Sequence, residues 1–216
     1  MNGLTSNINI KLPEPTLRRL PWYLAYVKLV QDQGVEYISS TQISKAINVD
    51  ASQIAKDLSF INISGKTRVG YEVASLVNVL ETFLGFTTCH QAIVYGVGRL
   101  GAALMQDSGL AQYGLEIVAG FDIRDIPAGT CINGIPVYHT SQFLEKRAEL
   151  NARIGILTVP VDHAQEATDF MVDCGIKAIW NFTPYRIHVP KNIVIQNTSI
   201  YAHLAVMFNR MNNINE

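Results

Sequence analysis

The chain has 216 residues, of which 48% are hydrophobic and 16% are charged, and its formal net charge is -1. Such a composition supplies a buried core for one large domain or two small ones, and the near-neutral balance gives no whole-chain electrostatic signature of a nucleic-acid partner. No apolar run approaches about 18 residues, so we expect neither a membrane-spanning segment nor a signal peptide.

The cysteines do not form a recognisable set. Cys89, Cys131 and Cys174 have no paired spacing, which argues against both a disulfide framework and a zinc site. Three unpaired thiols fit a reducing compartment, and we therefore expect a cytoplasmic protein.

The first 84 residues predict a small helical domain. Apolar residues recur near helical spacing from Thr16 to Val35, with Gly34 as a stop and Pro21 marking an early turn or a kink. Two short helices should follow between Ile38 and Asn62, on either side of a turn. Their apolar residues would share one seam: Ile43, Ile47, Val49, Ile54, Leu58 and Ile61.

This helix pair has the form of a helix-turn-helix motif. Ser39 with Gln42 fits a capping box at the first helix, and Asp50 with Gln53 fits a second one. Small polar and basic groups on the outer face of the second helix could enter a major groove: Ser52, Gln53, Lys56 and Ser59.

The segment Gly65 to Tyr71 resembles a wing hairpin, in which Lys66 and Arg68 would be the cations facing DNA. Short helix pairs also occur in proteins that never bind DNA. In that alternative, Lys56 is a solvated surface lysine and Arg68 pairs with a local carboxylate.

Residues 91–122 carry the strongest signal in the chain. An apolar run meets a G-x-G-x-x-G turn, and a helical segment, a second apolar run and Asp122 follow, in the order of a dinucleotide-binding unit. The turn would place free backbone N–H groups at a helix N-terminus, where a diphosphate binds. Its residues are Gly96, Val97, Gly98, Arg99, Leu100 and Gly101.

Asp122 predicts the form of the dinucleotide. It lies 21 residues beyond Gly101, where a carboxylate accepts hydrogen bonds from the adenosine ribose hydroxyls. It would repel a 2′-phosphate, which favours NAD(H) over NADP(H), although the nearby Arg124 weakens this inference. The alternative is an ordinary strand-to-helix turn that binds nothing.

The C-terminal segment predicts a helix with an unsatisfied apolar face. A strand at residues 192–195 precedes a helix over Ser199 to Met211. Ile200, Leu204 and Met207 fall on one side of that helix, which needs a partner surface either in its own domain or in a neighbour's.

Short sequence motifs in both halves of the chain resemble those of the Rex family of redox-sensing transcriptional repressors. The resemblance covers nearly the whole chain after about residue 10. The matching words include LPEPTLRRLPWYL (12–24), QIAKDLS (53–59), VGYEV (69–73), GVGRLG (96–101), AGFD (119–122), TVP (158–160), AQEA (164–167) and GIKAIWNFTP (175–184).

This resemblance implies a homodimer with an α/β fold. Residues 1–84 would form a winged helix-turn-helix DNA-binding domain, residues 85–197 a doubly wound Rossmann domain for NAD(H), and residues 198–216 a helix exchanged between protomers. The dimer would bind an inverted-repeat operator and release it when NADH binds. The resemblance also places Val159, Pro160, Asn181 and Phe182 beside the cofactor cleft.

The sequence departs from the family pattern at both sites. Ala55 stands where the recognition helix usually carries an arginine, and the wing is altered around Lys66. Losing one phosphate-contacting cation per subunit should weaken DNA binding. Asp107 stands where the family often has a tyrosine, and Ser199-Ile200 stands where it often has an Asp-Phe pair, so two aromatic faces near the expected nicotinamide position are missing. This leaves discrimination between NADH and NAD⁺ open.

Two other functions would use a similar glycine turn. A dehydrogenase needs a general acid or base and a substrate pocket, and too little chain follows the Rossmann unit to supply a catalytic domain, so we expect no enzyme. A nucleotide- or CoA-binding module without redox sensing is the second alternative. The fused helix-turn-helix argues against it.

Overall fold

The computed structural model describes residues 12–214, and the chain divides into two compact units between Thr87 and Thr88. The sequence placed the domain boundary after residue 84. Within the described residues, no helix combines the length and the apolar character needed to cross a membrane.

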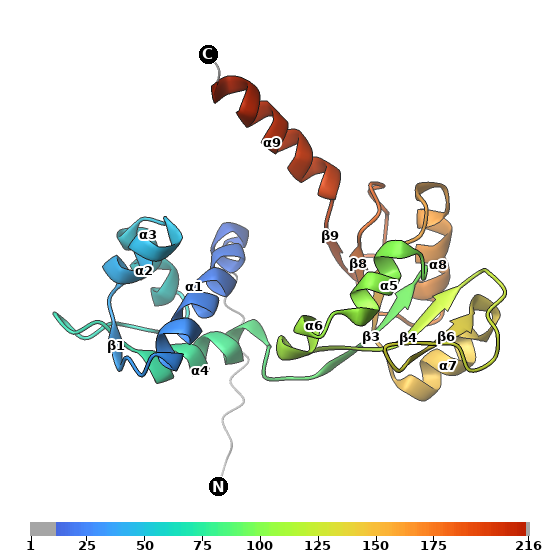
Figure 1. Cartoon of the computed structure of the whole chain (residues 1–216), viewed down its shortest axis with the longest axis horizontal. Coiled ribbons are helices and arrows are strands. Elements are labelled where there is room, and N and C mark those ends of the chain that lie inside the picture. The colour runs from blue at the N-terminus through green and yellow to red at the C-terminus, as the bar shows by residue number, and fades with distance from the viewer. Residues whose placement is uncertain (1–11, 215–216) are drawn as a thin grey trace, which may run out of the picture. The chain divides into compact units, whose positions relative to one another are not determined.

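The first unit is a helical domain with a two-stranded antiparallel sheet, in which β1 pairs with β2 (Figure 1). Its elements are α1 (Glu14–Asp32), β1 (Tyr37–Ile38), α2 (Ser40–Ile47), α3 (Ala51–Ser59), β2 (Tyr71–Glu72) and α4 (Val73–Leu84). Helix α1 begins before the predicted start and continues through Pro21, so this proline does not end it. An isolated bridge between Lys66 and Gly70 closes the predicted wing ahead of β2.

Helices α2 and α3 form the predicted helix-turn-helix. Ser39 and Gln42 make the full capping box of α2, and Asn48 takes a left-handed conformation in the turn, with φ of 53°. Asp50 caps α3 through the N–H groups of Ser52 and Gln53. The second capping box is incomplete, because the Gln53 side chain turns instead toward Asp57. The expected seam is in the core of this unit.

A buried carboxylate joins helix α3 to α1. Asp57 is 0% exposed and accepts hydrogen bonds from the guanidinium of Arg19 at 2.7 and 2.8 Å and from the Tyr23 hydroxyl at 2.6 Å. The Thr16 hydroxyl and the Gln53 amide donate at 2.9 and 2.8 Å. Because a buried charge is tolerated only when it is paired and hydrogen-bonded, this network fixes α3 against α1.

The network also keeps Asp57 ionised. Burial alone would raise the pKa of Asp57, but the four donor side chains outweigh it and lower the pKa to about 2. A carboxyl group whose folded pKa is depressed stabilises the fold above the ordinary aspartate pKa, near 4. That contribution is lost as the pH falls through about 2.

We expect Asp57→Asn to destabilise the first unit by about 3 kcal/mol at pH 7, because the amide leaves the Arg19 charge without its partner. The chain has two tryptophans, so Trp22 reports urea unfolding of this unit in a Trp180→Phe background. Asp32→Asn, at an exposed aspartate near the end of α1, is the matched control and should change little. Equal effects of the two variants would contradict the assigned role.

The second unit is a doubly wound α/β domain. Its strands are β3 (His90–Tyr95), β4 (Leu115–Asp122), β5 (Cys131–Ile132), β6 (Ile135–His139), β7 (Ile154–Leu157), β8 (Ala178–Asn181) and β9 (Val194–Asn197). Its helices are α5 (Arg99–Gln106), α6 (Gly109–Gln112), α7 (Phe143–Leu150), α8 (Ala164–Asp173) and α9 (Ile200–Ile214), with 3₁₀ turns η1 (Thr140–Gln142) and η2 (Val161–His163).

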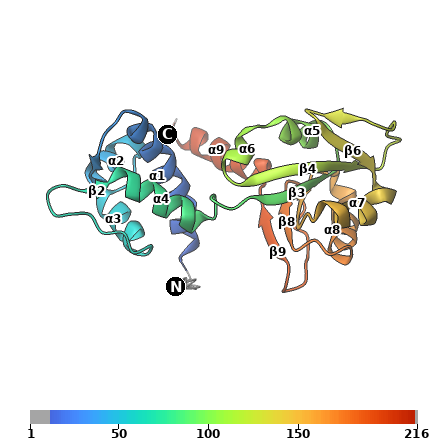
Figure 2. The ribbon, with the colours of Figure 1, turned by 90° about the horizontal axis from the view of Figure 1, so that it is seen from below.

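The seven strands lie in the order β5-β6-β4-β3-β7-β8-β9, and every pair is parallel except β5 with β6. From β3 the chain builds outward through β4 to β6, then crosses to β7 on the other side of β3. Figure 2 shows α5 on one face of the sheet and α7 and α8 on the other. Ligands of open α/β sheets bind where the strand order reverses, which here is the carboxyl edge between β3 and β7.

Helix α9 leaves the edge strand β9 and projects from the sheet (Figure 1). The strand begins two residues later than predicted, and the helix extends beyond Met211. Most of its large apolar side chains are about half exposed or more, whereas Leu204 is only partly exposed. The exposed ones are Ile200, Tyr201, Val206, Met207, Phe208 and Met211. The predicted apolar face therefore exists and is largely uncovered in the single chain.

Candidate functional site

The glycine turn is shaped by backbone packing. Gly96 has φ of 101°, and a Cβ there would lie 2.9 Å from the Val159 backbone nitrogen. A Cβ on Gly101 would lie 2.2 Å from the Gly96 carbonyl oxygen, so helix and turn touch through backbone atoms. The Thr158 hydroxyl donates to that same carbonyl at 2.6 Å. Two of the three glycines are therefore needed for the turn itself.

Gly98 is required for a different reason. A Cβ at this position would have no atom within 4 Å, and the residue has φ of -78°, which any amino acid can adopt. The space above Gly98 is thus open rather than filled by the protein. No side chain caps α5, so the N–H groups of its first turn, which includes Arg99 and Leu100, face this opening without a side-chain acceptor.

Asp122 ends β4 directly beside the turn. Its side chain accepts a hydrogen bond from the Val97 N–H at 2.8 Å, and Arg124 donates to both carboxylate oxygens through its side chain. Burial would raise the pKa of Asp122, but the hydrogen bonds from Arg124 and from Val97 outweigh it and lower the pKa. Asp122 is therefore a carboxylate at neutral pH, as the predicted recognition of a ribose requires.

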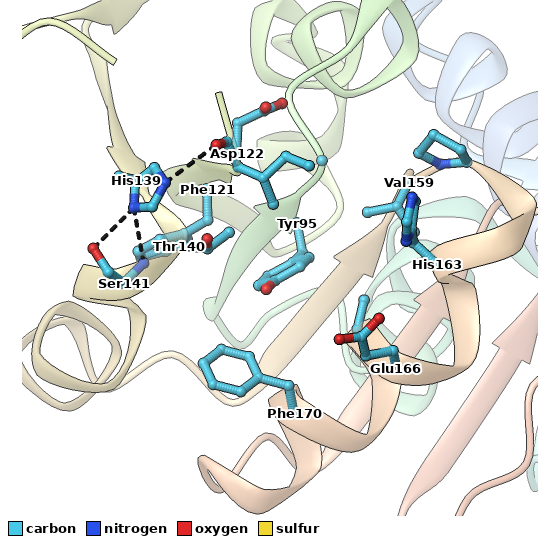
Figure 3. Close-up of a pocket in the computed structure, with 14 residues that line it drawn as sticks. Tyr95, Phe121, Asp122, His139, Thr140, Ser141, Val159, His163, Glu166 and Phe170 are labelled. Atoms are coloured by element: carbon cyan, nitrogen blue, oxygen red, sulfur yellow. Dashed lines mark hydrogen bonds between the residues drawn. The ribbon is translucent and has the colours of Figure 1, made fainter. Parts of the chain in front are cut away.

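A cavity of about 560 Å³ opens beside this carboxylate (Figure 3). It lies at the carboxyl ends of β3, β4, β6 and β7, where the sheet topology predicts a ligand. Its walls are mainly apolar and aromatic, with Tyr95, Phe121 and Phe170 among them. The remaining lining residues are Gly96, Asp122, Ile123, His139, Thr140, Ser141, Val159, Pro160, His163, Glu166 and Ala167.

One edge of the cavity is held by His139. Its Nε2 lies 3.1 Å from the Ile123 carbonyl oxygen, and its Nδ1 lies 2.8 Å from the Ser141 hydroxyl (Figure 3). A carbonyl can only accept, so Nε2 carries the proton and Nδ1 accepts from Ser141. The ring therefore ties the ends of β4 and β6 together and has a structural role at this edge.

The structure brings part of the predicted cofactor set together. Gly96, Asp122, Val159 and Pro160 line the cavity. The rest of the glycine turn follows Gly96 in the chain but is not part of the lining: Val97, Gly98, Arg99, Leu100 and Gly101. Asn181 does not line it. Its amide nitrogen donates to the Tyr185 carbonyl and to Asn197, and its oxygen accepts from Thr183.

Phe182 also lies outside the cavity lining. Its ring packs 4.7 Å from that of Trp180. Both side chains make contacts within the fold around β8. Their role in binding the cofactor therefore stays a prediction.

Most of the cavity wall was missed by the sequence reasoning. One group of missed residues follows strand ends, such as Ile123 after β4 and Thr140 after β6. Another falls on one face of the turn-helix segment after β7, at His163, Glu166 and Phe170. The spacing of three, four and seven residues along that segment was the available signal.

The two family departures near the nicotinamide position have local roles. Asp107 follows α5, and its carboxylate accepts from the N–H groups of Gly109 and Leu110, which starts α6. The Ser199 hydroxyl accepts from the Ala202 N–H at 3.2 Å and caps α9. Neither position supplies an aromatic face to a ligand.

The residues predicted to face DNA divide into free and engaged groups. Lys56 is exposed on α3, and Arg68 is exposed in the wing with φ of 65°. Lys66 lies 5.4 Å above the Tyr37 ring. None of these three cations forms an ion pair with a described residue, so the local carboxylate partner considered for Arg68 is not found there.

The polar residues of α3 are bound within the domain. The Ser52 hydroxyl donates to Asp50 at 2.5 Å, and the Ser59 hydroxyl donates to the Lys56 carbonyl at 2.7 Å. Gln53 is held by Asp57. In the described part of the chain, no cluster of three or more histidine, cysteine or acidic side chains is placed to hold a metal ion.

A helix-turn-helix unit joined to a doubly wound sheet with an open glycine turn defines a ligand-responsive transcription regulator. Two family models match the chain: "Putative DNA-binding protein N-terminus" over residues 11–59 and "CoA binding domain" over residues 87–185. The second match reflects the fold with a glycine turn that this chain has in common with CoA-binding domains.

Curated relatives specify the family. The chain is 66% identical to the redox-sensing transcriptional repressor Rex of Bacteroides thetaiotaomicron, over 94% of this chain and 92% of the relative. It is 62% identical to that of Bacteroides fragilis, over 98% and 96%. Identity to the Rex protein of Lactobacillus gasseri is 36%, over 92% of both chains.

Solved structures agree with these relatives. The structure of RSP in complex with beta-NAD+ and operator DNA has a TM-score of 0.89 at 32% identity and covers 94% of both chains. RSP in complex with beta-NADH has a TM-score of 0.84 at 33% identity, over 95% of this chain and 96% of that one. The chain belongs to the Rex family of redox-sensing transcriptional repressors, and it is a repressor rather than an enzyme.

The two kinds of glycine predict different substitution effects. We expect Gly101→Ala to destabilise the second unit by about 2 to 3 kcal/mol, because the methyl group would overlap the Gly96 carbonyl oxygen. Gly98→Ala is the control and should change stability by less than about 0.5 kcal/mol. Urea unfolding followed by Trp180 fluorescence in a Trp22→Phe background measures both, and the reverse order would refute this reading of the turn.

Proposed function

We propose that this chain is a homodimeric repressor that binds an inverted-repeat operator and releases it when NADH occupies the crevice of the second unit. In this proposal residues 1–84 are the DNA-binding domain and residues 85–197 the cofactor domain. Three free cysteines and the DNA partner support a cytoplasmic location. The complexes of RSP with operator DNA, beta-NAD+ and beta-NADH support the choice of ligands.

The binding mode follows from the crevice. The adenine would occupy the aromatic-walled cavity, and the adenosine ribose would lie against Asp122. The diphosphate would rest on the N–H groups above Gly98. The observation that carries this assignment is the open space at Gly98. The fold itself leaves room for a side chain at this position, so a glycine is needed there only if a ligand comes close to the backbone.

The DNA-binding mode rests on the outer face of α3 and on the wing. Lys56, Lys66 and Arg68 would contact phosphates, while Ser52 and Ser59 would lie close to the duplex at the helix surface. In a two-fold dimer the two recognition helices would reach successive major grooves about 34 Å apart. We assign Gln53 mainly to positioning α3, because its amide is held by Asp57.

Redox sensing requires coupling between the two sites. NADH and NAD⁺ differ in charge only at the nicotinamide ring, so that end of the crevice must supply any preference between them. Linkage then requires NADH and operator to weaken each other by the same factor. A hundredfold loss of operator affinity corresponds to about 2.7 kcal/mol of coupling.

We expect operator selection from random DNA to enrich an inverted repeat, and NADH to release this DNA more effectively than NAD⁺. Fluorescence anisotropy of the labelled operator measures both affinities. Gly98→Ala should bind operator as the natural chain does but require at least about tenfold more NADH for release, because the methyl group occupies the ligand's space.

Three outcomes would refute parts of this proposal. No enriched sequence would remove the repressor role of this chain. Equal release by NADH and NAD⁺ would leave a nucleotide sensor without redox preference. Normal release of Gly98→Ala by NADH would place the diphosphate elsewhere.

In this proposal residues 198–216, which contain helix α9, form the dimer element. Its apolar side chains are largely uncovered in one chain, and exchange into a second copy would bury them. Burying a Phe or Met side chain contributes about 1.5 to 3 kcal/mol, and a symmetric dimer doubles this figure.

Phe208→Glu should therefore weaken dimerisation at least about a hundredfold and reduce operator binding with it. Sedimentation equilibrium measures the dissociation constant. Asn209→Glu adds the same charge at the neighbouring exposed position and should leave the dimer largely intact. If the phenylalanine variant stays dimeric, α9 is not the dimer element.

A further inference from the structure

The pair formed by Asp122 and Arg124 has a consequence for the 2′ position of the ligand, and this inference rests on the proposed dinucleotide site. A carboxylate has four acceptor positions. In this structure Oδ1 accepts from the Arg124 backbone N–H at 3.0 Å and from its Nε at 2.9 Å. Oδ2 accepts from the Val97 N–H at 2.8 Å and from the Arg124 Nη2 at 3.0 Å.

Asp122 is therefore saturated before any ligand binds. Arg124 is also anchored to the glycine turn, because its Nη2 donates to the Val97 carbonyl oxygen at 2.6 Å. The ribose hydroxyls of NAD(H) need acceptors on Asp122, and these become free only when the guanidinium withdraws. Arg124 thus competes directly with an unphosphorylated ribose.

The same side chain is well placed for a phosphate. Asp122 is only 7% exposed, whereas 65% of the Arg124 side chain is exposed, so the guanidinium covers the carboxylate and faces solvent. The ion pair neutralises the charge that would repel a 2′-phosphate. A guanidinium presents a planar fork of donors that matches a phosphate group and can bind it bidentately.

We propose that Arg124 lets the crevice accept 2′-phosphorylated dinucleotides of the NADP(H) class in addition to NAD(H). With NAD(H), the guanidinium gives up Asp122 to the ribose hydroxyls. With NADP(H), it stays near Asp122 and donates to the phosphate. Removing the guanidinium should therefore change the two affinities in opposite directions. It should strengthen NAD(H) binding, because Asp122 becomes free for the ribose hydroxyls, and weaken NADP(H) binding, because the carboxylate then repels the 2′-phosphate.

Isothermal titration of the full-length protein with NADH and with NADPH tests this proposal. The quantity is the ratio of the NADPH dissociation constant to the NADH dissociation constant, in which effects on folding and on the part common to both ligands cancel. We expect a ratio within about tenfold of unity for the natural chain, and Arg124→Ala to raise it by about 10- to 100-fold. Thermal unfolding of the variant verifies its fold.

Arg186→Ala is the matched control, because Arg186 is an exposed arginine of the same unit that does not line the cavity. It should leave the ratio unchanged within about twofold. The role of Arg124 is overturned if Arg124→Ala does not raise the ratio, or if Arg186→Ala raises it equally. In either case, binding of NADH by the natural chain leaves the proposed function intact. Failure of the natural chain to bind either dinucleotide overturns both.

Discussion

Backbone packing at the end of β3 is the constraint on which the ligand site depends. Gly101 brings α5 against the Gly96 carbonyl oxygen, and the hydroxyl of Thr158, directly after the neighbouring strand β7, donates to the same carbonyl. This contact sets where α5 begins and therefore where its free N–H groups lie. It also fixes the distance from the turn to Asp122, which the Val97 N–H holds directly. The part of the crevice proposed to hold the diphosphate is thus built mostly from main-chain atoms, whose positions do not depend on rotamers.

The first unit solves a comparable positioning problem with a side chain. A single buried carboxylate at Asp57 gathers donors from α1 and from α3, so the orientation of the recognition helix is set by charge and hydrogen bonding as well as by the apolar seam. Apolar packing alone tolerates small rotations of a short helix, whereas several directional bonds to one group do not. The two units therefore use different means to hold their functional surfaces.

The sequence predicted the architecture well because its signals are local. Periodicity and capping gave α2 and α3, and glycine spacing gave the turn between β3 and α5 together with Asp122. The cavity wall was missed because Tyr95, His139 and Phe170 come from separate strands and helices, and only the strand order brings them together. The engagement of Gln53 and Asn181 was missed for a related reason. A polar residue on an outer face or beside a cleft can satisfy itself within the fold, and spacing does not reveal the partner.

The internal bonding of α3 has a consequence for how the operator is chosen. Ser52, Gln53 and Ser59 donate hydrogen bonds within their own domain, so in the proposed DNA complex Lys56 is the long side chain of that set that is free to reach the duplex. Fewer hydrogen-bond donors of that set then remain to read base edges directly. Indirect readout should carry more of the discrimination, with groove width and the bendability of the central base steps deciding which sites fit the dimer. Natural operators would then resemble one another more in the shape of the DNA than in its base sequence.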